Sequence, residues 1–94
     1  MVFINSKEKE KFLDDVLTLD SNQFEIILYN DDFNTFDWVI ESLMEVCKHD
    51  SIQAEQCAYI VHFTGKCSVK KGDFSVLEPI QRELSNRNLT CDIE

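Results

Sequence analysis

The polar stretch Asn30-Asp31-Asp32 contains the side chains best suited to bind a ligand. It follows an alternating apolar run at 24–29 and precedes a helical pattern, so we expect a loop between a strand and a helix. Together the three side chains offer many acceptor oxygens and only one donor group, which suits a cation with several N–H groups. The same residues are also typical of an Asx turn that leads into a helix, and their types alone favour that simpler interpretation.

His62 is the second candidate, because it lies near the end of a predicted helix that Gly65 closes. A histidine at a helix C-terminus is stabilised by the helix dipole, and this structural interpretation is the simpler one. In the functional interpretation, a neutral imidazole offers one acceptor nitrogen toward the loop at Asn30 and completes a ring of acceptors. The sequence leaves both interpretations open. We assign no role to His49, which lies in a predicted turn between two helices.

Little in the sequence supports catalysis or metal binding. It contains none of the motifs typical of lipases, zinc metalloproteases or nucleotide-binding enzymes. Asp31 and Asp32 are adjacent on a loop, so their carboxylates should point apart rather than act as an acid and base pair. The four cysteines include no C-x-x-C pair, and we expect them to be small buried apolar residues. We therefore expect no enzyme activity, no catalytic residue, no cofactor and no metal.

Composition bounds the size and the partners of the protein. A chain of 94 residues, 44% of them hydrophobic, predicts one small domain with a single core. The net charge of -9 disfavours binding to nucleic acid or to an anionic membrane and favours a basic partner surface. No apolar run approaches the ~18 residues that span a bilayer, and the opening apolar residues are too few for a signal peptide. We expect a cytoplasmic monomer.

The chain divides into an N-terminal arm and a compact domain. Residues 1–22 combine a mixed-charge run with a few apolar positions, so they form either a short amphipathic helix or a mobile arm. The compact domain should cover residues 23–94. It begins with a strand at 24–29, which is rich in β-branched and aromatic residues.

Two helices should follow this strand as a hairpin. We expect the first to be capped by Asn34, with Asp37 in the capping-box position three residues on. The second should be capped by Asp50 or Ser51 and closed by Gly65 in the left-handed conformation.

The last part of the chain predicts a weaker strand at 66–70, a third helix and a closing strand at 89–93. Pro79 lacks an N–H group and would break the interior of that helix. We therefore expect the helix to start at Ser75, with Glu78 as its capping-box partner, so that Pro79 falls in or next to the first turn. This order predicts an α+β domain in which a three-stranded sheet carries its helices on one face.

Several segments of the chain resemble the ClpS family of adaptor proteins. The matching residues are Asn30-Asp31-Asp32-Phe33-Asn34-Thr35 after an apolar strand, Val39-Ile40, Ala54-Glu55-Gln56 and Val61-His62-Phe63-Thr64-Gly65-Lys66-Cys67. The resemblance implies an α+β fold of three antiparallel strands packed on three helices in the order βααβαβ, similar to the C-terminal domain of the ribosomal stalk protein. It also implies an adaptor that binds the free N-terminal residue of N-degron substrates, typically Leu, Phe, Tyr or Trp. Such adaptors deliver their substrates to a ClpA or ClpC type AAA+ unfoldase that works with the ClpP protease.

The resemblance also assigns site residues by position. The residues that would hold the α-amino group are Asn30, Asp31 and His62, with Asp32 adjoining them. The positions that would surround the substrate side chain are Asn34, Phe36, Val39, Ala58, Val61 and Leu89.

Two pocket positions depart from the family pattern. Phe36 stands where the family usually has a flexible Met. Ala58 is smaller than the usual residue at its position, so it offsets the pocket volume that the Phe36 ring occupies. The alternative function, from a different class, is an interaction domain that regulates a Clp unfoldase without reading N-termini.

Overall fold

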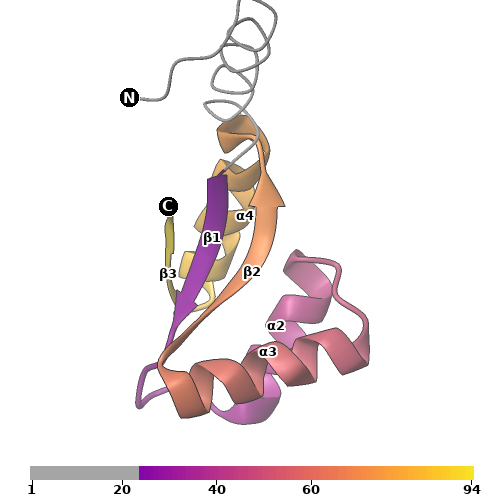
Figure 1. Ribbon diagram of the computed structural model, residues 1–94, viewed down its shortest axis with the longest axis vertical. Coiled ribbons are helices and arrows are strands. Elements are labelled where there is room, and N and C mark those ends of the chain that lie inside the picture. The colour runs from indigo at the N-terminus through magenta and orange to yellow at the C-terminus, as the bar shows by residue number, and fades with distance from the viewer. Residues whose placement is uncertain (1–23) are drawn as a thin grey trace, which may run out of the picture.

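The computed structural model describes residues 24–94, and the predicted arm of residues 1–22 lies outside this part of the chain. Within it the elements are β1 (Phe24–Tyr29), α2 (Phe36–Val46), α3 (Ser51–Thr64), β2 (Lys66–Gly72), α4 (Phe74–Asn86) and β3 (Thr90–Ile93) (Figure 1). The predicted order βααβαβ and the α+β class are confirmed.

The sheet places β1 between β2 and β3, and both pairings are antiparallel. At the end of β1, Tyr29 lies opposite Lys66 of β2 and Thr90 of β3. At its beginning, the backbones of Glu25 and Glu94 exchange two hydrogen bonds of 2.9 and 2.8 Å. Because β1 is the central strand, the loop that follows it lies next to the start of both neighbouring strands.

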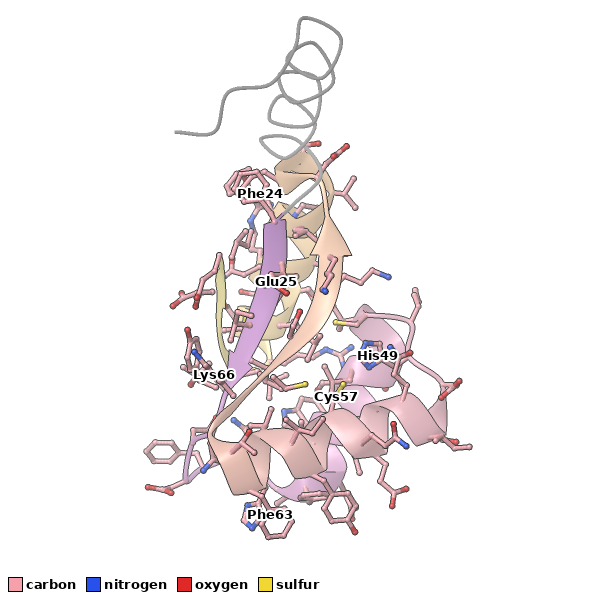
Figure 2. All side chains as sticks on the ribbon, viewed as in Figure 1. Phe24, Glu25, His49, Cys57, Phe63 and Lys66 are labelled. Carbon is pink, nitrogen blue, oxygen red and sulfur yellow. The ribbon has the colours of Figure 1, made fainter. Side chains whose placement is uncertain are left out.

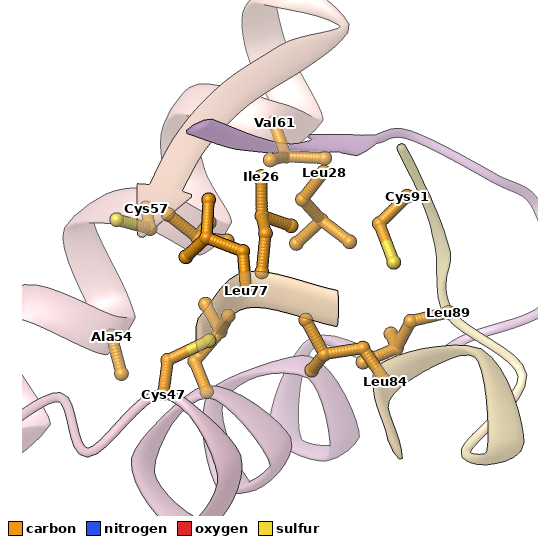
Figure 3. Packing of buried hydrophobic residues seen from close by; sticks show 12 residues of the cluster. Ile26, Leu28, Cys47, Ala54, Cys57, Val61, Leu77, Leu84, Leu89 and Cys91 are labelled. Carbon is orange, nitrogen blue, oxygen red and sulfur yellow. The ribbon is translucent and has the colours of Figure 1, made fainter. Parts of the chain in front are cut away.

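The hydrophobic core lies between the sheet and the helices (Figure 3). Ile26 and Leu28 alternate along β1 and are buried against α4, the helix that covers one face of the sheet and contributes Leu77 and Leu84 (Figure 1). The helices α2 and α3 pack on each other near the end of β1. They complete the core with Leu43, Cys47, Ala54, Cys57 and Val61.

The start of α2 differs by one residue from the prediction. Thr35, not Asn34, is the N-cap, and its hydroxyl accepts a hydrogen bond from the Trp38 backbone N–H at 3.1 Å. The Asn34 side chain is oriented differently, because its amide N–H group donates to the carboxylate of Asp31 at 2.7 Å. Asp37 therefore lies in the first turn without the predicted capping-box spacing, where its charge still favours the positive end of the helix.

Both predicted ends of α3 are confirmed. The Asp50 carboxylate accepts a hydrogen bond from the Gln53 backbone N–H at 2.7 Å, so of the two predicted caps Asp50 is the one used. At the other end Gly65 adopts φ = 98°, and its N–H donates to the carbonyl of Val61. A residue with a side chain would be strained in this left-handed conformation, so glycine fixes where the helix stops.

The predicted start of α4 at Ser75 is wrong. The helix begins at Phe74, so Pro79 lies in its interior. The packing explains why this start is preferred: Phe74 lies edge-on to Phe24 with ring centroids 5.6 Å apart, and Leu77 is completely buried. Pro79 is exposed, so the Ser75 carbonyl that lacks a helical donor faces solvent, and tertiary packing outweighs the cost of the proline.

No helix of the described chain combines the length and apolar character needed to cross a membrane.

Candidate ligand-binding site

A cavity of about 340 Å³ opens beside the loop that follows β1. Its lining consists of Leu28, Tyr29, Asn30, Asp31, Asp32, Asn34, Phe36, Val39, Ala58, Val61, His62 and Leu89. The structure therefore brings together all ten residues that the sequence singled out, although they come from four separate segments of the chain. Leu28 and Tyr29 were not predicted to be part of the site. Their place at the end of β1, directly before the polar loop, is the signal that could have indicated them.

The loop after β1 is joined directly to the end of α3. The backbone N–H of Asn30 donates to the Gly65 carbonyl at 2.9 Å, which continues the pairing of Tyr29 with Lys66. His62 lies on the last turn of α3, three residues before Gly65. The glycine stop of the helix thus fixes the imidazole beside the polar loop.

Asp31 organises this loop. One carboxylate oxygen accepts the backbone N–H groups of Phe33 and Asn34 at 2.9 and 2.8 Å, and the other accepts the Asn34 amide at 2.7 Å. Partial burial raises the pKa of the Asp31 carboxyl, but the hydrogen bonds from Asn34 and Phe33 outweigh this effect and lower it below 3.8. The carboxylate is therefore charged at neutral pH and its orientation is fixed.

The opposite wall of the cavity is tied to the same loop through the turn between α4 and β3. The Asn34 amide also donates to the Asn88 carbonyl at 2.8 Å, and the Trp38 indole N–H donates to the Arg87 carbonyl at 3.0 Å. Asn88 adopts φ = 67°, and the next N–H, that of Leu89, returns to the Leu84 carbonyl at 3.0 Å. This is a Schellman ending, and it buries Leu89 against the core.

The cavity is polar at its mouth and apolar inside. Asn30, Asp32 and His62 are exposed, and their side chains have no hydrogen-bond partner among residues 24–94. Deeper in the cavity the lining is apolar and buried or half-buried, and consists of Leu28, Phe36, Val39, Ala58, Val61 and Leu89. Such a cavity can pair with several N–H donors at its mouth while it takes up an apolar group inside.

The comparisons with known proteins show the family and the fold of the chain. A family model described as "ATP-dependent Clp protease adaptor protein ClpS" matches residues 20–92. The chain belongs to the ClpS family. Among solved structures, the fold is similar to that of Agrobacterium tumefaciens ClpS2 bound to L-phenylalaninamide, with a TM-score of 0.74 and 17% sequence identity over 80% of this chain and 96% of that chain. No curated protein sequence gives a match.

Four rings contact one another beside the cavity of this ClpS-family chain: Phe36 and His62 belong to its lining, whereas Tyr59 and Phe63 lie outside it. Phe36 lies edge-on to Tyr59, with ring centroids 4.8 Å apart, and edge-on to His62 at 6.1 Å. Phe63 closes the circuit, because it stacks on Tyr59 at 6.0 Å and meets His62 edge-on at 4.9 Å. Figure 2 shows Phe63 projecting from α3 away from the sheet. Tyr59 was not singled out from the sequence, because no helical spacing rule pairs it with a residue on α2.

A second cavity, of about 360 Å³, has the opposite charge. Lys48, Lys70 and Lys71 are among its lining residues. His49 also lies there and is buried, with Nε2 2.7 Å from the carbonyl oxygen of Val69 (Figure 2). This bond connects the turn between α2 and α3 to β2 and gives a structural role to a histidine that the sequence left without one. Its lysines would repel an ammonium group, so the first cavity is the better site for a cationic ligand.

The cysteines are mostly residues of the hydrophobic core. All four lie in the described chain and are free, and Cys47, Cys57 and Cys91 are buried. Burial raises the pKa of the Cys47 thiol to about 11 and that of the Cys57 thiol to about 12. Within residues 24–94 no group of three or more His, Cys, Asp or Glu side chains is placed to hold a metal ion.

Proposed function

We propose that this chain binds the free N-terminal residue of proteins marked for degradation and delivers them to a Clp AAA+ unfoldase. One observation carries the proposal: acceptor groups that have no partner among residues 24–94 lie at the mouth of an apolar cavity in a ClpS-family chain. A protein's N-terminus offers an ammonium with three N–H donors next to a side chain of variable size. The two parts of the cavity match these two parts of the ligand.

The acceptors at the mouth divide their work. Asn30, Asp32 and His62 have acceptor atoms that are unpaired within the described part of the chain, so they would accept the three N–H groups of the α-ammonium. The Asp31 carboxylate accepts three hydrogen bonds within its own loop, so its main contribution would be a fixed negative charge and the position of the loop. Hydrogen bonds that involve a charged group are worth about 1.5 to 3 kcal/mol each.

The apolar interior would take the first side chain of the substrate. Burying a Leu or Phe side chain contributes about 1.5 to 3 kcal/mol. After the cost of association, an affinity of about 1 μM is reasonable. The ligand of the similar Agrobacterium ClpS2, L-phenylalaninamide, combines a free α-amino group with a benzyl side chain, and this supports the proposal.

Peptide binding tests this proposal directly. We expect a fluorescent peptide with N-terminal Phe to bind at about micromolar affinity in an anisotropy titration. Its N-acetylated form should bind at least about tenfold more weakly, because acetylation removes the positive charge and the N–H donors that the acceptors at the mouth would bind. If both forms bind equally or neither binds, the proposal is wrong. The alternative, a domain that regulates an unfoldase without reading N-termini, would then be favoured.

Delivery is a separate claim with its own experiment. A stable reporter protein that begins with Phe should be degraded by a ClpA or ClpC type unfoldase with ClpP faster when this adaptor is present. The same reporter with N-terminal Ser is the control. If the adaptor binds the peptide but does not accelerate degradation of the Phe reporter, delivery is contradicted while recognition stands.

A further inference from the structure

We infer that Tyr59, which lies outside the cavity lining, makes the proposed side-chain pocket selective for aromatic N-terminal residues by fixing Phe36 as a rigid wall. This inference rests on the proposed recognition of N-terminal residues and adds the class of side chain that is preferred. It follows from the circuit of four rings formed by Phe36, Tyr59, Phe63 and His62.

Phe36 is held from more than one side. It is the first residue of α2, directly after the N-cap Thr35, so its backbone is set by the start of the helix. Its half-buried ring meets the edge of Tyr59 at an interplanar angle of 61° and that of His62 at 85°. Edge-to-face arrangements of this kind are favourable beyond the area they bury. Rotation of Phe36 would break both contacts at once.

A fixed aromatic wall treats different side chains differently. An incoming Phe or Tyr ring can meet Phe36 in a favourable aromatic geometry, whereas Leu gains only burial. Ile and Val branch at Cβ and need width close to the backbone, where the wall cannot move aside. Behind Phe36 the small side chain of Ala58, only 4% exposed, leaves depth for a planar ring.

Tyr59 is suited to test this inference because it can be changed without removing a lining residue. It belongs to the same helix as Ala58 and His62, but its side chain is 47% exposed and lies outside the cavity. We therefore treat it as a positioning residue that acts through Phe36. A change at Tyr59 should alter the ratio of two affinities rather than abolish binding.

The experiment compares peptides that differ only in their first residue, Phe, Leu or Ile, each with a free and an acetylated amine. We expect the wild type to bind the Phe peptide about threefold to tenfold more tightly than the Leu peptide and to bind the Ile peptide most weakly. Tyr59→Leu should reduce the Phe-to-Leu ratio to within about twofold, mainly by weakening the Phe peptide. Tyr59→Phe keeps the ring and should keep the wild-type ratio. Phe36→Leu removes the wall itself and should reproduce the loss.

The possible outcomes distinguish a failure of the aromatic preference from a failure of the proposed recognition of N-terminal residues. If the free amine is required but Leu binds as tightly as Phe in the wild type, the aromatic preference is wrong and the proposed function survives. If Tyr59→Leu keeps both its thermal transition and the wild-type ratio, Tyr59 has no role in selectivity. If free and acetylated Phe peptides bind alike, the proposed function fails, and this inference fails with it.

Discussion

Asp31 and Asp32 are adjacent residues of the same type, but they have different hydrogen bonding and different exposure. The Asp31 carboxylate accepts three hydrogen bonds within its own loop, whereas the Asp32 side chain is exposed and has none among residues 24–94. The first aspartate therefore maintains the shape of the site. The second is free to meet a ligand.

Substitution of each aspartate should separate these tasks. Asp31→Ala leaves the N–H groups of Phe33 and Asn34 without their acceptor, so it should lower the free energy of unfolding by about 1 to 2 kcal/mol and weaken peptide binding. Asp32→Ala should weaken peptide binding by a comparable factor and leave stability unchanged. Urea unfolding and anisotropy on the same preparations measure both effects. Equal stability of the two variants would contradict the division of roles.

The pH dependence of stability should reflect Asp31. Its pKa in the folded protein lies below 3.8, the ordinary value, because the charged form is hydrogen-bonded. The resulting stabilisation is fully present above pH 3.8 and is lost as the pH falls through the lowered folded-state pKa. Asp31→Asn should therefore flatten the acid side of a plot of unfolding free energy against pH. A variant curve parallel to the wild type between about pH 2 and 5 would contradict this assignment.

Asn30 and His62 offer the most direct test of amine recognition. We expect Asn30→Ala and His62→Ala each to weaken the binding of a free N-terminal Phe peptide about tenfold, or about 1.4 kcal/mol, because each removes an acceptor for the ammonium. Both residues are exposed, so neither substitution should unfold the domain, although His62→Ala also removes the edge-on contacts of the imidazole with Phe36 and Phe63. Asp37→Ala is the matched control, since it removes an exposed acid just outside the cavity lining. Wild-type affinity in either variant would remove that residue from the site.

Among the secondary-structure elements, α2 is a helix whose N-cap the sequence rules did not predict correctly. Asn34 and Thr35 are both good capping residues, and the local sequence does not choose between them. The Asn34 amide donates both to the nearby Asp31 carboxylate and to the carbonyl of Asn88, 54 residues away, and the second of these contacts is the one that the local sequence does not indicate. A contact at that separation leaves no trace in helical periodicity or capping patterns.

The same contrast holds for the site. The polar loop, Gly65 and the apolar stripes follow from local chemistry, so the strands, the helices and the ends of α3 could be predicted. The family resemblance supplied the ten residues that the cavity unites. Tyr59 was missed as a partner of Phe36 because α2 and α3 meet only through tertiary packing, which depends on the angle between the helices.

Pro79 makes a prediction about α4. In the helix interior it removes one backbone hydrogen bond, so Pro79→Ala should raise the free energy of unfolding by about 1 to 3 kcal/mol, less what the proline contributes by restricting the unfolded chain. Val76→Ala, another exposed position of the same helix, should change stability by much less. Both are measured by urea unfolding. A loss of stability in Pro79→Ala would show that the ring makes packing contacts that outweigh the missing bond.

For the whole molecule, charge is unevenly distributed. The net charge of the chain is -9, but three of its lysines line the second cavity, whereas Asp31 and Asp32 line the first. The acidic surface should attract cationic peptides over distances up to about a Debye length and should do so less at high salt. The distribution of charge thus favours binding of a cationic ligand at the first cavity rather than at the second.

The packing of the whole domain should also protect its thiols. At neutral pH the buried Cys47 and Cys57 thiols, with pKa raised to about 11 and about 12, are almost entirely protonated and react slowly. Brief treatment with iodoacetamide at pH 7.5 should modify Cys67, the half-buried one, first, as read by mass spectrometry of peptides. Denaturation in urea should expose all four. Rapid labelling of Cys57 in the folded protein would contradict the packing of α3 against β2.

The last strand, β3, connects the cavity wall to the beginning of β1. Leu89, just before β3, supplies part of the cavity wall, while Glu94 at the chain end is hydrogen-bonded to the beginning of β1. The same short stretch, residues 89–94, thus forms part of the cavity wall and pairs with the beginning of β1. If the chain binds peptides as proposed, variants that weaken the pairing of β3 with β1 should also weaken peptide binding, because Leu89 of the cavity wall leads directly into β3.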